Sequence, residues 1–159
     1  MVAVLNSSAK VREVNIVGDC VWAVYNTPYK SDIDEVFTIA AYALTLRKLL
    51  NHHYAKKDID PINIGIGVDW GRALMIKAGY SGSGINDVIY MGDVVNRAAH
   101  LAHEAGRSWR DPIFLGGDFQ TNLSADNQKW LKPTYVQGLG NVYTADVIMS
   151  SMSEWIDNL

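Results

Sequence analysis

Apolar residues are arranged in short β-like runs near the start of the chain. Positions 11–17 and 20–25 are rich in Val, Ile and aromatic residues, as is typical of strands. Gly18-Asp19 lies between them and is a turn signal. The pattern therefore predicts a β-hairpin with Asp19 at its tip.

Two later segments have helical spacing. Apolar positions between Val36 and Leu50 predict a long helix that begins near Ser31 or Asp32 and runs to about residue 57. A second helix is predicted from Asp93, as its N-terminal cap, to a closing glycine at 106.

The region between these helices has strand character. Residues 62–68 predict a strand, and 72–78 predict its partner after a turn at 69–71. A glycine- and serine-rich loop at 79–84 leads to another apolar strand at 88–91. Alternate glycines within 62–68 permit close packing of a helix.

The last third adds shorter elements. We expect a strand at 113–115, a short helix at 118–123, strands near Tyr135 and at 142–148, and then a polar tail containing Trp155. The whole pattern predicts an α+β fold of the ferredoxin-like kind, with an antiparallel sheet core and helices on one face.

Composition limits the class of protein. The 159 residues fit one domain, with 48% apolar and 19% charged residues and a net charge of −3. A net negative charge does not indicate binding to nucleic acid or to an anionic membrane surface. The single cysteine allows no internal disulfide, and no apolar stretch reaches the ~18 residues of a membrane span. We expect a cytoplasmic protein.

Two local arrangements suggest chemistry. A carboxylate at a tight hairpin turn, such as Asp19, suits a hard divalent cation, although, taken alone, an ordinary turn Asp is the better explanation because Gly-Asp is common in hairpin turns. Asn96 and His100 are four residues apart on one helix face, where they could hold a phosphate-bearing ligand. Arg97 points about 100° away from Asn96 on an ideal helix.

Taken in order and spacing, these segments resemble the class III adenylyl/guanylyl cyclase catalytic domains. The matching segments are 14–19, like the family's Gly-Asp metal hairpin, 64–73, like its Ile-Gly-Ile-His-Thr-Gly strand, and 92–96, like its Gly-Asp-Thr-Val-Asn helix start. Asp69 stands where the family has His. The resemblance covers about residues 11–148 of a single cyclase homology domain, 1–159.

The resemblance implies an enzyme that works as a head-to-tail homodimer. The ribose 3′-oxygen of a nucleoside triphosphate attacks the α-phosphorus, with two Mn²⁺ or Mg²⁺ ions bound. Asp19 is then a metal ligand and Asn96 orients the ribose. The family's transition-state Arg falls at His100, so either His100 or another cation, with Arg97 the adjacent one, takes that role.

The resemblance also bears on the substrate. The family's two base-reading positions are Asn15 and Ile89 here, which lack the charged purine code. Asn15 can both donate and accept, as a pyrimidine edge requires. This pattern resembles the bacterial Pycsar cyclases, which make cyclic UMP or cyclic CMP in anti-phage defence, and we favour UTP over CTP. Arg72 and Lys77 could meet the triphosphate or lie in solvent.

One family motif has no match. Class III domains begin with a strand carrying Phe-x-Asp-x-x-Gly-Phe and the first metal Asp, and nothing before Val11 fits it. Asp69, Asp87 and Asp93 are candidate replacements. Two alternatives therefore stay open: a degenerate domain that binds nucleotide or only dimerises, and an adenylyl or guanylyl cyclase.

Overall fold

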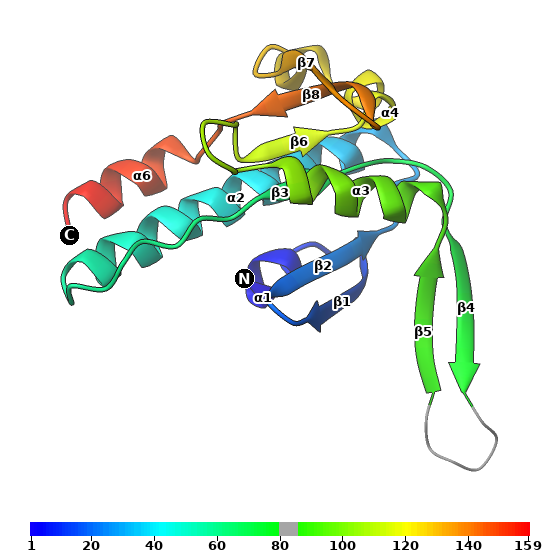
Figure 1. Ribbon diagram of the computed structural model, residues 1–159, viewed down its shortest axis with the longest axis horizontal. Helices are drawn as coiled ribbons and strands as arrows, with labels where there is room; N and C mark the ends of the chain where they lie inside the picture. Colours follow the sequence, from blue (N-terminus) through cyan, green and yellow to red (C-terminus); the bar gives the residue numbers. More distant parts are fainter. Residues whose placement is uncertain (80–85) are drawn as a thin grey trace.

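A computed structural model describes residues 1–79 and 86–159, so most of the predicted loop at 79–84 lies outside the described residues (Figure 1). The helices are α1 (Val2–Leu5), α2 (Lys30–Ala55), α3 (Asp93–Glu104), α4 (Gly117–Asn122), α5 (Ala125–Gln128) and α6 (Ser150–Asp157). The strands are β1 (Val11–Val17), β2 (Cys20–Tyr25), β3 (Ile66–Val68), β4 (Leu74–Gly79), β5 (Asn86–Met91), β6 (Ile113–Leu115), β7 (Lys132–Val136) and β8 (Gly140–Ala145).

The predicted first hairpin is confirmed, with the predicted bounds. β1 and β2 pair antiparallel as a two-stranded sheet, with Val17 opposite Cys20. Gly18 has φ +62°, the left-handed conformation that the first central residue of this tight hairpin turn needs. Asp19 follows Gly18 and is exposed at the tip.

A four-stranded sheet with the order β3-β6-β8-β7 forms the centre of the molecule. β3 pairs parallel to β6, and the other pairs are antiparallel. The predicted pairing of 62–68 with 72–78 is wrong, because β4 pairs with β5 and leaves the sheet. Both runs have strand patterns, and such a pattern does not specify the partner strand.

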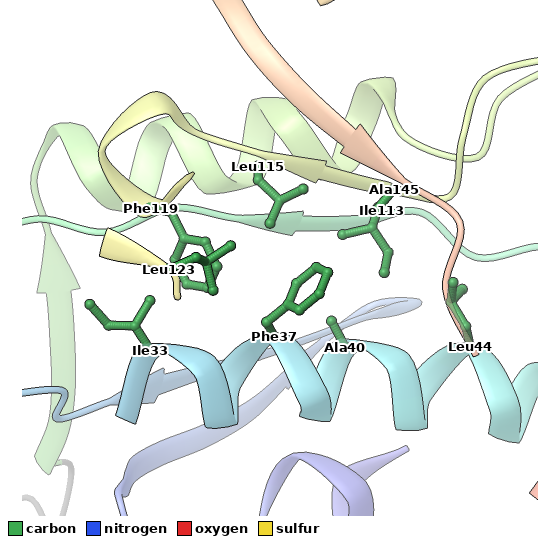
Figure 2. Packing of buried hydrophobic residues seen from close by; sticks show 9 residues of the cluster. All are labelled: Ile33, Phe37, Ala40, Leu44, Ile113, Leu115, Phe119, Leu123 and Ala145. Atoms are coloured by element: carbon green, nitrogen blue, oxygen red, sulfur yellow. The ribbon is translucent and has the colours of Figure 1, made fainter. Parts of the chain in front are cut away.

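The core lies between α2 and one face of this sheet (Figure 2). Side chains at helical spacing on α2 meet side chains from β6, α4 and β8; the buried set is Ile33, Phe37, Ala40, Leu44, Ile113, Leu115, Phe119, Leu123 and Ala145. Asp32 does not occupy the cap position itself. It lies in the first turn of α2, where its carboxylate accepts a hydrogen bond from the Tyr29 N–H at 2.9 Å.

α3 covers the opposite face of the sheet, so the expectation of helices on one face holds for α2 but not for α3. A second cluster joins α3 to the sheet through Leu101, Ala105, Phe114, Val136 and Val142. β6 makes this possible because successive side chains point to opposite faces of a strand. The N-cap of α3 is Gly92, and Asp93 is its first helical residue, not the predicted cap.

Two elements extend from this body. The β4–β5 hairpin protrudes as an arm beyond the N-terminal end of α3 (Figure 1). The predicted polar tail instead forms α6, which packs along α2 through buried Ile156 and an ion pair between Lys48 and Asp157. Among residues 1–79 and 86–159, no helix is long and apolar enough to cross a membrane.

Candidate functional site

The β1–β2 hairpin, the base of the arm and the start of α3 meet although they are distant in sequence. Trp22 of β2 contacts Tyr90 of β5, with ring centroids 6.4 Å apart. Gly92, at the start of α3, lies against the backbone of Arg72 at the base of β4. These contacts bring together segments that carry most of the sequence-predicted site residues.

Asp19 and Asn15 are both exposed on the first hairpin. The Asn15 Oδ1 accepts a hydrogen bond from the Ile16 N–H at 2.8 Å, which leaves the amide NH₂ and the second lone pair of Oδ1 available. Asp19 has the hard oxygen ligands that Mg²⁺ or Mn²⁺ prefers. Within the described residues, however, no group of three or more His, Cys, Asp or Glu is suited to a metal ion. Asp19 thus fits one corner of a metal site and needs further ligands.

α3 presents Asn96 and His100 on its exposed side. Arg97 points elsewhere: its Nε lies 3.1 Å from Oδ2 of Asp69, at the end of β3. The contact is an ion pair without the alignment of a good hydrogen bond. Sequence spacing thus indicated the separation of Arg97 from Asn96, and the structure adds the partner of Arg97.

Asp69 is the most constrained charged side chain near the site. Its side chain is only 3% exposed, and its Oδ1 has no hydrogen-bond partner among the described residues. That oxygen lies where a Cβ on Gly116 would be, so the slot exists because residue 116 is glycine. Burial raises the pKa of the Asp69 carboxyl; the Trp70 backbone N–H and then Arg97 oppose the shift, and Asp118 adds to it.

This environment makes Asp69 a poor replacement for the missing metal ligand, because its carboxylate faces Arg97 and the glycine slot. Asp93 is exposed in the first turn of α3. The backbone of Asp87 pairs with Ala78, and its side chain lies outside the described residues. Among the side chains that the structure describes, Asp93 does not join Asp19 in a group of metal ligands.

Comparisons with known proteins show which family the chain belongs to. Residues 2–108 match the adenylate and guanylate cyclase catalytic domain. The chain belongs to the class III cyclase family. Its fold is also that of a bacterial light-regulated adenylyl cyclase, with a TM-score of 0.68 and 19% identity over 97% of this chain and 78% of that one.

Two curated relatives are named uridylate cyclases. The one from Treponema porcinum is 35% identical over 158 residues, which are 99% of this chain and 55% of the relative. The one from Gulbenkiania mobilis is 46% identical over 106 residues, which are 64% of this chain and 41% of the relative. The chain thus spans about half the length of these relatives.

The remaining predicted residues of this cyclase domain are dispersed along the arm. Arg72 is exposed at its base, beside Gly92, whereas Lys77 is exposed farther out on β4. Ile89 is opposite Ile76 and lies on the other face of the β4–β5 ribbon from Tyr90. Sequence reasoning did not find Trp22 and Tyr90; the pairing of Asn15 with Trp22 in the hairpin register was the available signal.

A cavity of about 530 Å³ lies away from these residues, between α2, α6 and the segment before β3. Several of its polar groups already bind one another, since Arg47 donates to Asn63 and Asn51 exchanges hydrogen bonds with the backbone of Ile62, whereas Nε2 of His52 has no partner among the described residues. We therefore place the candidate site at the hairpin and α3, not in this cavity.

Proposed function

We propose that this domain is a nucleotide cyclase that converts UTP, with CTP as the second choice, to its 3′,5′-cyclic nucleotide and pyrophosphate. The observation that carries the proposal is Asn15 on an exposed strand face, four residues before Asp19, in a chain whose curated relatives are named uridylate cyclases. An amide can pair with both the donor and the acceptor on a uracil edge.

The reaction divides among the described side chains. The ribose 3′-hydroxyl gives its proton to solvent water, its oxygen bonds to the α-phosphorus, and the bond from the α-phosphorus to the bridging oxygen breaks so that pyrophosphate leaves. Asn96 orients the ribose from α3, and His100, on the same helix face, supplies the donor to the developing charge. Arg97 is paired with Asp69 and holds α3 against the end of β3.

Class III cyclases use divalent metal ions. Asp19 would hold Mn²⁺ or Mg²⁺, two ions by analogy with the family, and these would neutralise charge on the triphosphate. In the family, a second Asp binds the same metal ions as the Gly-Asp hairpin. We expect this second carboxylate on the strand of the Phe-x-Asp-x-x-Gly-Phe motif, paired with the free edge of β3. Within the described residues, β3 pairs only with β6 and the β1–β2 hairpin stands as a separate sheet, which supports this position.

Cyclase domains are typically dimeric, and we propose a head-to-tail homodimer here. One face of the β4–β5 arm carries Leu74, Ile76, Ile89 and Met91, and all four are exposed. An apolar face of this kind marks an interaction surface. The product would be a cytoplasmic second messenger, and the resemblance to Pycsar cyclases suggests a role in antiviral defence.

The test is a product screen on a purified form of the protein that carries the strand with the first metal Asp, with Mn²⁺ and each of the four nucleoside triphosphates, read by chromatography and mass spectrometry. We expect cyclic UMP and pyrophosphate, lost in Asp19→Ala and kept in Asp126→Ala, a matched change of an exposed carboxylate on α5. Asp19-dependent UTP binding without turnover would favour the degenerate nucleotide-binding domain. A purine product would favour the adenylyl or guanylyl alternative, and neither binding nor turnover would overturn the proposal.

A further inference from the structure

The aromatic contact between Trp22 and Tyr90 lies beside the base-reading position of the proposed site. Their rings meet edge to face, at an interplanar angle of 76° and a centroid separation of 6.4 Å. Both side chains are half-buried. Such a pair contributes about 0.5–1.5 kcal/mol beyond its area burial, so each ring restrains the other.

Strand geometry fixes which face of the hairpin this pair occupies. Tyr25 points toward α1, because its hydroxyl donates to the Leu5 carbonyl at 2.6 Å. Trp22 is three residues earlier on the same strand, so its side chain is on the opposite face. Asn15 is directly opposite Trp22 in the register and therefore shares that face.

The distance between Asn15 and the indole follows from the same register. Side chains of directly opposed residues have Cβ atoms about 4.5–5.5 Å apart. A base that pairs with the Asn15 amide must therefore lie within one side-chain length of the Trp22 ring. Tyr90, on β5, holds that ring from the side of the arm.

The neighbouring residue Ile89 does not share this position. Successive residues of β5 point to opposite faces, so Ile89 belongs to the exposed apolar face of the arm, opposite Ile76. The residue of β5 that reaches the hairpin is Tyr90. Ile89 therefore lies on the other face of β5 from the Trp22–Tyr90 contact.

We propose that Trp22, held in place by Tyr90, is the wall that restricts the base site beside Asn15 to a single-ring base. The inference rests on the proposed nucleotide site and adds its size limit. A pyrimidine can approach Asn15 and contact the indole, whereas the second ring of a purine meets the indole itself. Hydrogen bonding by Asn15 alone gives no such limit on size.

The experiment compares kcat/KM for UTP and ATP in the full chain with Mn²⁺, together with equilibrium binding of both nucleotides. Trp22→Leu opens the wall and Tyr90→Leu removes its support, so each should raise the ATP-to-UTP ratio by about tenfold or more, the scale on which pocket size discriminates. Tyr90→Phe keeps the ring and should keep the ratio. Trp130→Leu, at a residue 63% exposed beside β7, is the matched control.

The possible failures are separable. If the parent chain neither binds nor converts UTP, the proposed function itself fails. If the parent prefers UTP and both leucine variants, shown to be folded by circular dichroism, keep the same ratio in turnover and in binding, only the aromatic wall is overturned. An equal loss for both nucleotides also overturns it, because a wall removes discrimination and not overall affinity.

Discussion

Gly67→Ala is expected to damage the site without touching it. Gly67 lies on β3 beneath α3, and a Cβ there would be 2.1 Å from the Ala98 carbonyl oxygen and 2.2 Å from the Ala102 nitrogen. Real Cβ atoms essentially never approach other atoms within 3.0 Å. Both obstacles are helix backbone, which has no rotamer to change, so α3 must move about 1 Å from the sheet.

The size of the effect follows from this displacement. Overpacking of this kind costs typically about 1–3 kcal/mol, and removing a glycine from the unfolded chain returns only about 0.4–1 kcal/mol. We therefore expect a net loss near 1–2 kcal/mol. For a domain of this length that lowers Tm by roughly 2–8 °C. Since α3 carries Asn96 and His100, a shift of about 1 Å should also lower UTP turnover by about 10²-fold.

The assay pairs urea or thermal unfolding with turnover of UTP under Mn²⁺. Gly117→Ala is the matched control, because a Cβ on this helical residue meets nothing within 4 Å and should be neutral or slightly stabilising. If Gly67→Ala keeps both the parent's Tm and its turnover, α3 is not seated on β3 as described, and the reasoning is refuted.

Three further outcomes follow from particular contacts. Burial raises the pKa of Asp69, so the unfolding free energy of the parent relative to Asp69→Asn should fall as pH rises above the ordinary aspartate value of 3.8; urea titrations that give a constant difference would contradict this. Burial, with Glu35 nearby, raises the pKa of Tyr25 to about 12. The unfolding free energy of the parent relative to Tyr25→Phe should therefore fall as pH rises from 10.0 toward 12. If this difference in unfolding free energy does not change with pH, the buried position of Tyr25 is refuted. Leu74→Glu should shift sedimentation from dimer to monomer, with Lys77→Glu on the other face of the arm as control; an unchanged dimer excludes this face as the interface.

Local patterns were sufficient for the elements that carry the site. The hairpin around Asp19 follows from two β-rich runs and a Gly-Asp turn, and α3 follows from apolar spacing closed by Gly106, whose φ of +66° suits a helix end. The strand at 62–68 was extended too far, because only three of its residues find partners on β6. α6 was missed because a single buried Ile156 and a salt bridge to Lys48 fix it, and neither leaves a clear pattern.

The candidate site divides along the same line. Asp19 was predicted from a hairpin turn and Asn96 from helix spacing, whereas Asn15 was predicted only from the resemblance to the cyclase family. The Asp69–Arg97 pair and the Trp22–Tyr90 contact join residues far apart in sequence, and one sequence without tertiary contacts does not reveal such pairs. A partial signal was available for Asp69, a carboxylate directly after a strand of alternating glycine and isoleucine.

The long-range contacts decide what the locally predicted residues can do. Asn96 and His100 are exposed, so nothing in their own surroundings fixes their position relative to the hairpin. Their position is set through α3, whose backbone packs directly on Gly67. Arg97 of α3 is paired with Asp69, and the Asp69 carboxylate fills the space beside Gly116. The Asp69 carboxylate is buried and its Oδ1 has no hydrogen-bond partner among the described residues, which costs desolvation free energy. This cost is consistent with a role for Asp69 in holding α3 in place at the expense of local stability. The orientation of the proposed reacting groups thus depends on residues that contact no substrate, and substitutions at Gly67, Asp69 or Gly116 should affect turnover as strongly as those at Asn96.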